Sequence, residues 1–213
     1  MAQWRPDPTF YPSARLAMQA PRENLAYVAA FNPKKDGKPD AMTVVDLEPG
    51  SSTYGHIVGK VEMPNAGDEL HHFGWNACSS ALCPYAPHPH IERRYLIVPG
   101  LRSSRIHILD TKPDPRQLKI VRVIEPEEVF GRARYSRFHT IHCGPEGIYI
   151  SALGSPDGGA PGDGVRSWMV KLDADSAGRL TMDPNFFVEF DGYRSHQIRL
   201  EGGDCSSDSY CYP

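Results

Sequence analysis

The sequence predicts an all-β, propeller-like fold of about three four-stranded antiparallel sheets, and three observations favour this class. First, 20 Pro and 19 Gly are spread through the 213 residues, which is typical of short strands joined by turns. Second, apolar segments that end on Asp46, Asp110 and Asp173 recur at intervals of 64 and 63 residues. Third, other apolar segments flank these three in a constant order, as expected for a repeat architecture.

The first repeat unit contains three expected strands. An aromatic residue begins the first strand, Asp46 ends the second, and a Pro closes the third. These strands occupy residues 27–30, 43–46 and 58–64. Helix is sparse in the whole sequence, and one short turn is expected at residues 125–130.

The second and third units contain four expected strands each, because a His-bearing segment precedes the aromatic-led strand. The strands are residues 71–75, 95–98, 107–110 and 120–126, then 139–143, 149–152, 169–173 and 186–190. A lone strand at residues 196–200 could be the fourth strand that the first unit lacks, which would join the two ends of the fold. Four-stranded antiparallel sheets repeated around an axis are the blades of a β-propeller. An all-β sandwich with an accidental repeat is the alternative.

Three blades do not close a ring, since propellers typically have four to eight. We therefore expect a single partial propeller domain over residues 1–213, with an incomplete ring. The loop at residues 154–165 is rich in Gly, Pro and Asp, and we interpret it as a junction.

Charge and composition exclude several classes of protein. Lys and Arg total 23 against 26 Asp and Glu, and this net charge of −3 does not favour binding to nucleic acid or anionic membranes. No apolar run reaches the roughly 18–20 residues that span a bilayer, and no export signal is visible. Five Cys, an odd number, then indicate free thiols or metal ligands rather than disulfides. We expect a cytoplasmic protein.

Four motifs resemble those of the selenium-binding protein / methanethiol oxidase family, in its bacterial form, and they occur in the same order. The motifs are residues 68–80 (DELHHFGWNACSS), 101–106 (LRSSRI), 139–143 (HTIHC) and 201–208 (EGGDCSSD). The resemblance is discontinuous, because residues 1–160 resemble the family's N-terminal part and residues 164–213 its C-terminus. Family members are more than twice this length and form seven-bladed propellers. The central blades are thus expected to be missing, through an internal deletion, a misassembled gene model or a genuine short paralogue.

The resemblance implies a copper enzyme that oxidises methanethiol with oxygen and water to formaldehyde, hydrogen sulfide and hydrogen peroxide. Copper suits imidazole ligands, and the innermost strands of a propeller line its channel. The histidines on expected innermost strands are therefore candidate copper ligands: His71, His72, His139, His142 and His196. The alternative for any single one of them is a buried hydrogen-bonding residue.

Strand geometry limits which of these histidines can meet. Adjacent residues on a strand point to opposite faces, so only one of His71 and His72 is expected to face the channel unless a bulge intervenes. His139 and His142 are three apart and are likewise expected to face differently. Asp68 and Glu69 could accept hydrogen bonds that orient a ligand histidine, or they could form a solvated acidic turn.

Cysteines are the candidates for selenium or thiol binding. In animal members of the resembled family a Cys has been proposed as the selenium site, but the matching residue here is Gly55. This departure puts selenium attachment at that position in doubt. The remaining candidates are Cys78, Cys83 and Cys205, although a small buried packing residue is an alternative role for Cys78.

Two functions of different classes follow from these expectations. The first is a copper-dependent methanethiol oxidase whose partners are a small thiol and O2, with no nucleic acid. The second is a non-catalytic partial propeller that binds selenium or thiols, or associates with another chain through open strand edges. A third idea is that two chains complete one ring of six blades.

Overall fold

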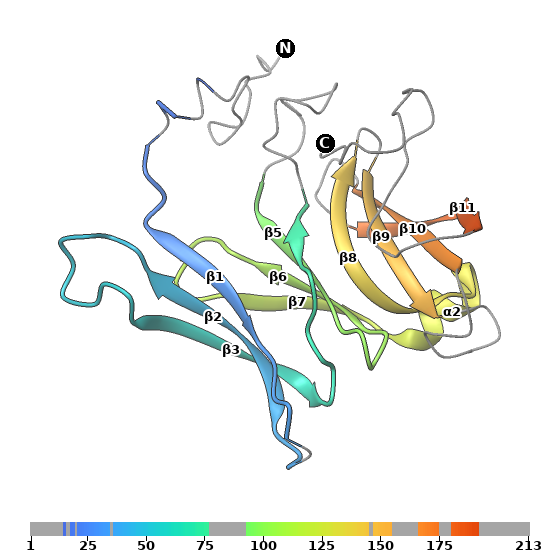
Figure 1. The fold of residues 1–213 in the computed structure, drawn as a ribbon, viewed down its shortest axis with the longest axis horizontal. Coiled ribbons are helices and arrows are strands. Elements are labelled where there is room, and N and C mark those ends of the chain that lie inside the picture. Colours follow the sequence, from blue (N-terminus) through green and yellow to red (C-terminus); the bar gives the residue numbers. More distant parts are fainter. Residues whose placement is uncertain are drawn as a thin grey trace.

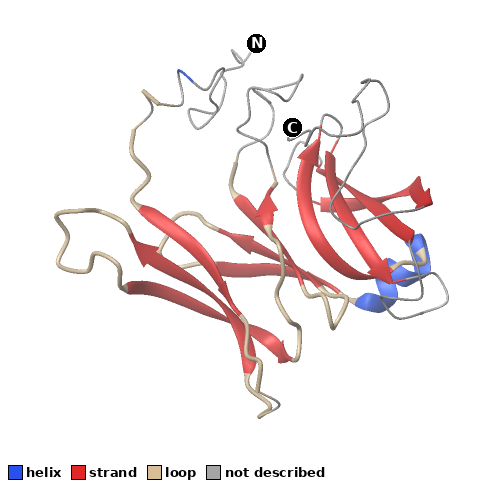
Figure 2. Cartoon of the chain, in the orientation of Figure 1, coloured by secondary structure: helices blue, strands red, loops and turns tan. Residues whose placement is uncertain are grey.

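The computed structural model of the chain describes residues 21–34, 36–76, 93–144, 147–154, 166–174 and 180–191, together with Arg15, Met18 and Gln19. Strands make up most of the described chain (Figure 2). They form three separate antiparallel sheets, which follow one another along the sequence (Figure 1). The predicted all-β, incomplete propeller-like fold is confirmed.

The first sheet has three strands in the order β1-β2-β3, as predicted. Asp46 ends β2 and organises the turn to β3: its carboxylate accepts hydrogen bonds from the Glu48 N–H (2.8 Å), the Ser51 hydroxyl (2.7 Å) and the Thr53 hydroxyl (2.6 Å). A side-chain oxygen that accepts from the N–H two residues on is the usual way in which Asp starts a turn. The strands are Leu25–Ala30 (β1), Pro39–Asp46 (β2) and Ile57–Ala66 (β3).

The second and third sheets have four strands each, again as predicted, in the orders β4-β5-β6-β7 and β8-β9-β10-β11. One expectation is wrong: β4 covers only two residues, so His71 and His72 precede it instead of lying on it. The expected strand at residues 196–200 and residues 155–165 of the expected junction lie outside the described residues. The strands are Gly74–Trp75 (β4), Tyr95–Pro99 (β5), Ile106–Asp110 (β6), Lys119–Ile124 (β7), Ser136–Gly144 (β8), Gly147–Gly154 (β9), Arg166–Ala174 (β10) and Leu180–Asp191 (β11).

The recurring Asp has the same role in the second sheet. Asp110 ends β6, and its Oδ1 accepts a hydrogen bond from the Lys112 N–H at 2.9 Å. Its carboxylate also receives two hydrogen bonds from the guanidinium of Arg94, at 2.7 and 2.6 Å. In the first two sheets, the recurring Asp therefore provides a hydrogen-bond acceptor where β2 and β6 turn back.

The helix α2 (Pro126–Ala133) joins β7 to β8. Pro126 begins it, Glu127 and Glu128 lie in its first turn, and Arg134 ends it in the left-handed conformation. Proline at the first position and acidic residues near the N-terminus both favour a helix there. No helix in the described ranges is long and apolar enough to cross a bilayer.

Two apolar cores hold successive sheets together. Successive side chains of β5 point to opposite faces of the second sheet and so contribute to both cores. Leu96 and Val98 belong to the core shared with the first sheet, and Ile97 belongs to the core shared with the third. The first core consists of Met42, Val44, Met63, Leu70, Leu96, Val98, Leu109 and Leu118. The second consists of Ile97, Ile106, Ile108, Ile124, Val129, Tyr135, Phe138, Ile141, Ile148, Ile150 and Ala152.

Candidate metal centre

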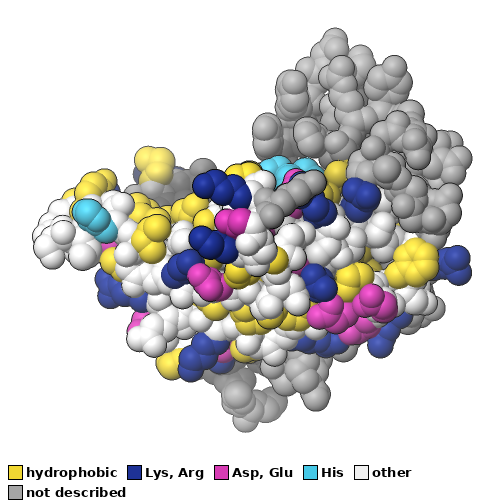
Figure 3. Space-filling model, turned by 90° about the horizontal axis from the view of Figure 1, so that it is seen from below, with side chains coloured by type: hydrophobic (Ala, Val, Ile, Leu, Met, Phe, Trp, Pro, Cys, Tyr) yellow, Lys and Arg dark blue, Asp and Glu magenta, His cyan; other side chains and the backbone are white. Residues whose placement is uncertain are grey.

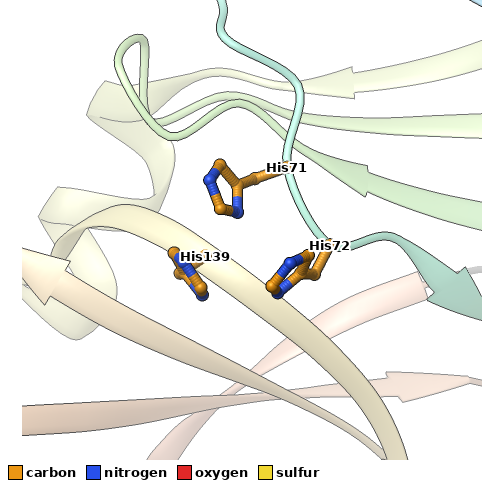
Figure 4. A group of neighbouring side chains, drawn as sticks. All are labelled: His71, His72 and His139. Carbon is orange, nitrogen blue, oxygen red and sulfur yellow. The ribbon is translucent and has the colours of Figure 1, made fainter. Parts of the chain in front are cut away.

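Three histidines from two separate segments come together between the second and third sheets. His71 and His72 lie in the connection from β3 to β4, and His139 lies on β8 (Figure 4). One ring nitrogen from each lies within 4.8 Å of the others. The ring of His71 is 4.0 Å from that of His139 between centroids, and His72 is 4.8 Å from each.

The segment that carries His71 and His72 is not a regular strand, and this allows both rings to join the group. Its only β-bridges among the described residues are two isolated ones, from Leu70 to Gly100 and from His72 to Thr140. Glu69 has a φ of 54°, which breaks the extended conformation just before the histidines. The strict alternation of side chains that would separate two neighbours applies only to a regular strand. The expectation that only one of the two faces the site is therefore wrong.

His139 is placed by the core of the third sheet. Its neighbour Phe138 is fully buried in the second core, and His139 itself is 7% exposed. The pairing of β8 with β9 shifts in register between Phe138 and Ile141. His142 is exposed and is not part of the three-histidine group. His139 and His142 thus differ in exposure, as expected for two residues that are three positions apart on a strand.

The hydroxyl of Thr140 orients two of the three rings. Its Oγ1 lies 2.6 Å from Nδ1 of His139 and 3.3 Å from Nδ1 of His72. The backbone N–H of Thr140 donates to the Ser151 hydroxyl at 3.1 Å, which ties the residue to β9. A partner on one ring nitrogen sets the tautomer and the direction of the other. Thr140 was missed in the sequence, although its position between two motif histidines was a signal.

The ring of His71 has one nitrogen, Nδ1, that is both buried and without a hydrogen-bond partner within the described part of the chain. Burial, and next the charge of His72 when protonated, lower the pKa of His71, while Glu69 acts in the opposite direction. A lowered pKa favours the neutral imidazole, which is the form that binds metals.

Asp68 and Glu69 form their ion pairs with residues outside the three-histidine group. Asp68 is fully buried, and its carboxylate lies 3.2 Å from the Arg105 guanidinium and 3.4 Å from Nε2 of His107. Burial alone would raise the pKa of Asp68, but the contacts with His107, Ser103 and Arg105 outweigh it and lower that pKa. Glu69 forms an ion pair with Arg102 and acts on His71 through its charge.

Four candidate residues, His196, Cys78, Cys83 and Cys205, lie outside the described residues and stay predictions. Gly55 is described: it is exposed, in a turn, with a φ of 77°. This left-handed conformation suits glycine better than a residue with a side chain. The local backbone therefore accounts for a glycine where the resembled family has a proposed selenium-site Cys.

The three imidazoles fit a transition metal ion. Nitrogen ligands from histidine suit copper, zinc, iron and nickel, and a buried ring nitrogen without a partner is costly unless a ligand satisfies it. In the space-filling view, histidine side chains lie together on the surface beside charged residues (Figure 3). An ion held there could be reached from outside through the exposed His72.

Comparison with known proteins agrees with this architecture. The family model described as "56kDa selenium binding protein (SBP56)" matches residues 4–166 and 163–211. A solved structure of a hypothetical selenium-binding protein from Sulfolobus tokodaii is 58% identical, with a TM-score of 0.70, and the match covers 78% of this chain and 36% of that one.

Curated relatives carry two kinds of name. Selenium-binding protein 3 of Arabidopsis thaliana is 43% identical over 156 residues, which are 72% of this chain and 32% of that protein. A methanethiol oxidase of Bos taurus is 40% identical over 154 residues, or 71% of this chain and 32% of that protein. The chain thus spans about a third of the length of these relatives. With the family model matching most of its residues in two segments, the chain belongs to the 56kDa selenium binding protein family.

Proposed function

We propose that the chain is a methanethiol oxidase that holds copper at His71, His72 and His139. The observation that carries this proposal is the convergence of the three ring nitrogens within 4.8 Å. Relatives named methanethiol oxidase, at about 40% identity, support the reaction. Copper, when bound, would supply the redox chemistry by which O2 and water convert methanethiol to formaldehyde, hydrogen sulfide and hydrogen peroxide.

The protein residues have distinct tasks in this proposal. Burial and next the charge of His72 when protonated lower the pKa of His71, which favours the neutral ring that a metal binds. Thr140 contacts His72 and His139 through their Nδ1 atoms, so Nε2 of each would be the nitrogen that remains to hold an ion. The adjoining apolar core, with Phe138 and Ile141 on the same strand, limits water on the inner side of the site.

A copper titration of the purified chain tests the proposal. Single variants His71→Ala, His72→Ala and His139→Ala should each reduce bound copper, measured by elemental mass spectrometry, and should reduce methanethiol-dependent O2 consumption. His72 is exposed, so its variant is the least disturbing to the fold. His56→Ala is the matched control, because His56 is an exposed histidine outside the group. Wild-type copper content in all three variants would refute the site, and copper binding without peroxide production would refute the reaction.

A second candidate function, a non-catalytic interaction module, is favoured by the first sheet. This sheet has three strands and carries exposed apolar side chains, among them Val28 and Ile57. Open strand edges and apolar surface promote association with another chain. Size-exclusion chromatography with light scattering tests this: a metal-free, associating chain supports the module, whereas a monodisperse copper-loaded monomer contradicts it. Selenium or thiol binding at Cys78, Cys83 or Cys205 belongs to the same alternative.

A further inference from the structure

We propose that Asp68 is a positioning residue, which holds the segment carrying His71 and His72 against the turn between β5 and β6 and so brings both rings to His139. This inference rests on the proposed metal site. It concerns how the site is assembled, since Asp68 itself does not belong to the three-histidine group.

The segment needs such an anchor because its own backbone does not hold it in a sheet. Between the end of β3 at Ala66 and the start of β4 at Gly74, its ladder contacts are two isolated bridges. The φ of 54° at Glu69 is unfavourable for a residue with a side chain and persists only where surrounding contacts impose it. Those contacts must come from elsewhere in the fold.

Asp68 provides contacts through both its side chain and its backbone. The carboxylate is fully buried, with Arg105 at 3.2 Å and the equally buried His107 at 3.4 Å. Its carbonyl oxygen accepts from the N–H groups of Arg102 (3.0 Å) and Ser103 (3.4 Å). Arg105 is the hydrogen-bond partner of Oδ1, and Oδ2 lies near Nε2 of His107 without a hydrogen bond. Because removing one partner of a buried ion pair is strongly unfavourable, the Arg105 contact holds Asp68 in place.

Asp68 and the turn approach each other closely at position 100, where glycine leaves room for the contact. A Cβ atom added to Gly100 would lie 3.1 Å from the Asp68 carbonyl oxygen and 3.2 Å from the Asp68 Cβ. It would also lie 2.5 Å from the Ser103 hydroxyl, a distance that real Cβ atoms do not tolerate. The segment and the turn are thus packed backbone against backbone.

The same turn also contacts the strand of the third histidine. The hydroxyl of Ser104 accepts a hydrogen bond of 2.8 Å from the backbone N–H of Arg137, two residues before His139. Ser104 and Arg137 both have positive φ values, 61° and 57°. The turn therefore connects Asp68, three residues before His71, with β8, in addition to the direct bridge between His72 and Thr140.

Asp68→Asn tests the proposal, because it removes the charge and keeps the size of the side chain. Two measurements are made: copper affinity by competition titration with the Cu(II) electron paramagnetic resonance spectrum, and native-state hydrogen exchange of the metal-free protein. Copper affinity should fall by about 10- to 100-fold, the range seen when groups behind the ligands are changed. Exchange of the His71 amide, which donates to the Pro99 carbonyl at 2.9 Å, should accelerate at least about tenfold.

Asp46→Asn is the matched control, since Asp46 is also a buried carboxylate that accepts several hydrogen bonds, but in the first sheet. It should lower the thermal midpoint and leave copper affinity and His71 exchange unchanged. Arg105→Gln is a milder second variant, and Arg105→Lys should restore part of the affinity that Arg105→Gln loses.

The outcomes separate this inference from the proposed function. Wild-type copper affinity, spectrum and His71 exchange in Asp68→Asn would overturn the positioning role. If the wild-type protein binds no copper, the proposed function fails, and hydrogen exchange alone decides the positioning role: faster exchange at His71 in Asp68→Asn supports it, and unchanged exchange overturns it.

Discussion

Replacing Phe138 by Ala should both destabilise the fold and weaken the metal site. Phe138 is fully buried among apolar residues of the second and third sheets, and it directly precedes His139 on β8. Removing a fully buried Phe side chain costs its transfer free energy plus that of the cavity, in total about 3–5 kcal/mol. Total stabilities of single domains are about 5–15 kcal/mol, so the loss is a large share of the whole.

Urea unfolding followed by tryptophan fluorescence measures this loss. Phe31→Ala is the matched control, because the same side chain is removed at a position that is 55% exposed. That variant should change the free energy of unfolding by about 0.5 kcal/mol or less. Phe138→Leu, which keeps most of the volume, should cost less than about 1.5 kcal/mol.

The comparison of Phe138→Ala with Phe31→Ala also tests the link between core and site. Copper affinity should fall in Phe138→Ala, since the strand bearing His139 loses its packing, and it should stay constant in Phe31→Ala. Equal losses of stability in the two variants would refute the assignment of Phe138 to the core. A destabilised Phe138→Ala protein with unchanged copper affinity would refute the link.

Three further predictions concern pH and packing. The three hydrogen bonds to Asp46 lower the pKa of its carboxyl group from 3.8 to about 2. The stability that this group contributes is therefore present above pH 3.8 and is lost as the pH falls toward 2. Asp46→Asn should flatten the acid-unfolding curve in that pH range. His72→Gln removes an imidazole that is positively charged only when protonated, and it should raise the pKa of His71, which an NMR titration of the His71 ring protons would record. Gly59→Ala should destabilise the protein by about 1–3 kcal/mol, because the added Cβ would lie 2.0 Å from the Arg116 carbonyl oxygen.

Two of these predictions have a control within the chain. His56→Gln changes an exposed histidine outside the group and should leave the titration of His71 unchanged. Gly131→Ala, in α2 with nothing within 4 Å of the added Cβ, should stabilise the helix by about 0.5–1 kcal/mol. An acid-unfolding curve of Asp46→Asn identical to that of the wild type, or a fully stable Gly59→Ala protein, would contradict the corresponding argument.

The order of strands was predictable from the sequence because it depends on local patterns. Apolar runs define the strands, and the Asp at the end of β2 and β6 marks a turn through a hydrogen bond to the N–H two residues later. Because these interactions join residues that are close in the sequence, each repeat unit shows them as the same local pattern. The strand numbers of the three sheets followed from that pattern.

The candidate histidines were also visible in the sequence, but their convergence was not. His71 and His72 both join His139 because Glu69 has a positive φ and the segment has left the sheet, and strand periodicity cannot express either feature. Asp68 was a candidate either for orienting a ligand histidine or for a solvated acidic turn, whereas its buried carboxylate lies beside Arg105 and His107.

The sequence by itself determined which residues form strands, where the sheets turn back and which side chains could bind a metal. Only the tertiary structure decided which histidines meet. The physical reason is that strand formation depends on neighbours along the chain, while the site depends on contacts between the segment before β4, the turn after β5 and β8. These contacts join residues more than 30 positions apart, as between Asp68 and Arg105 or Ser104 and Arg137.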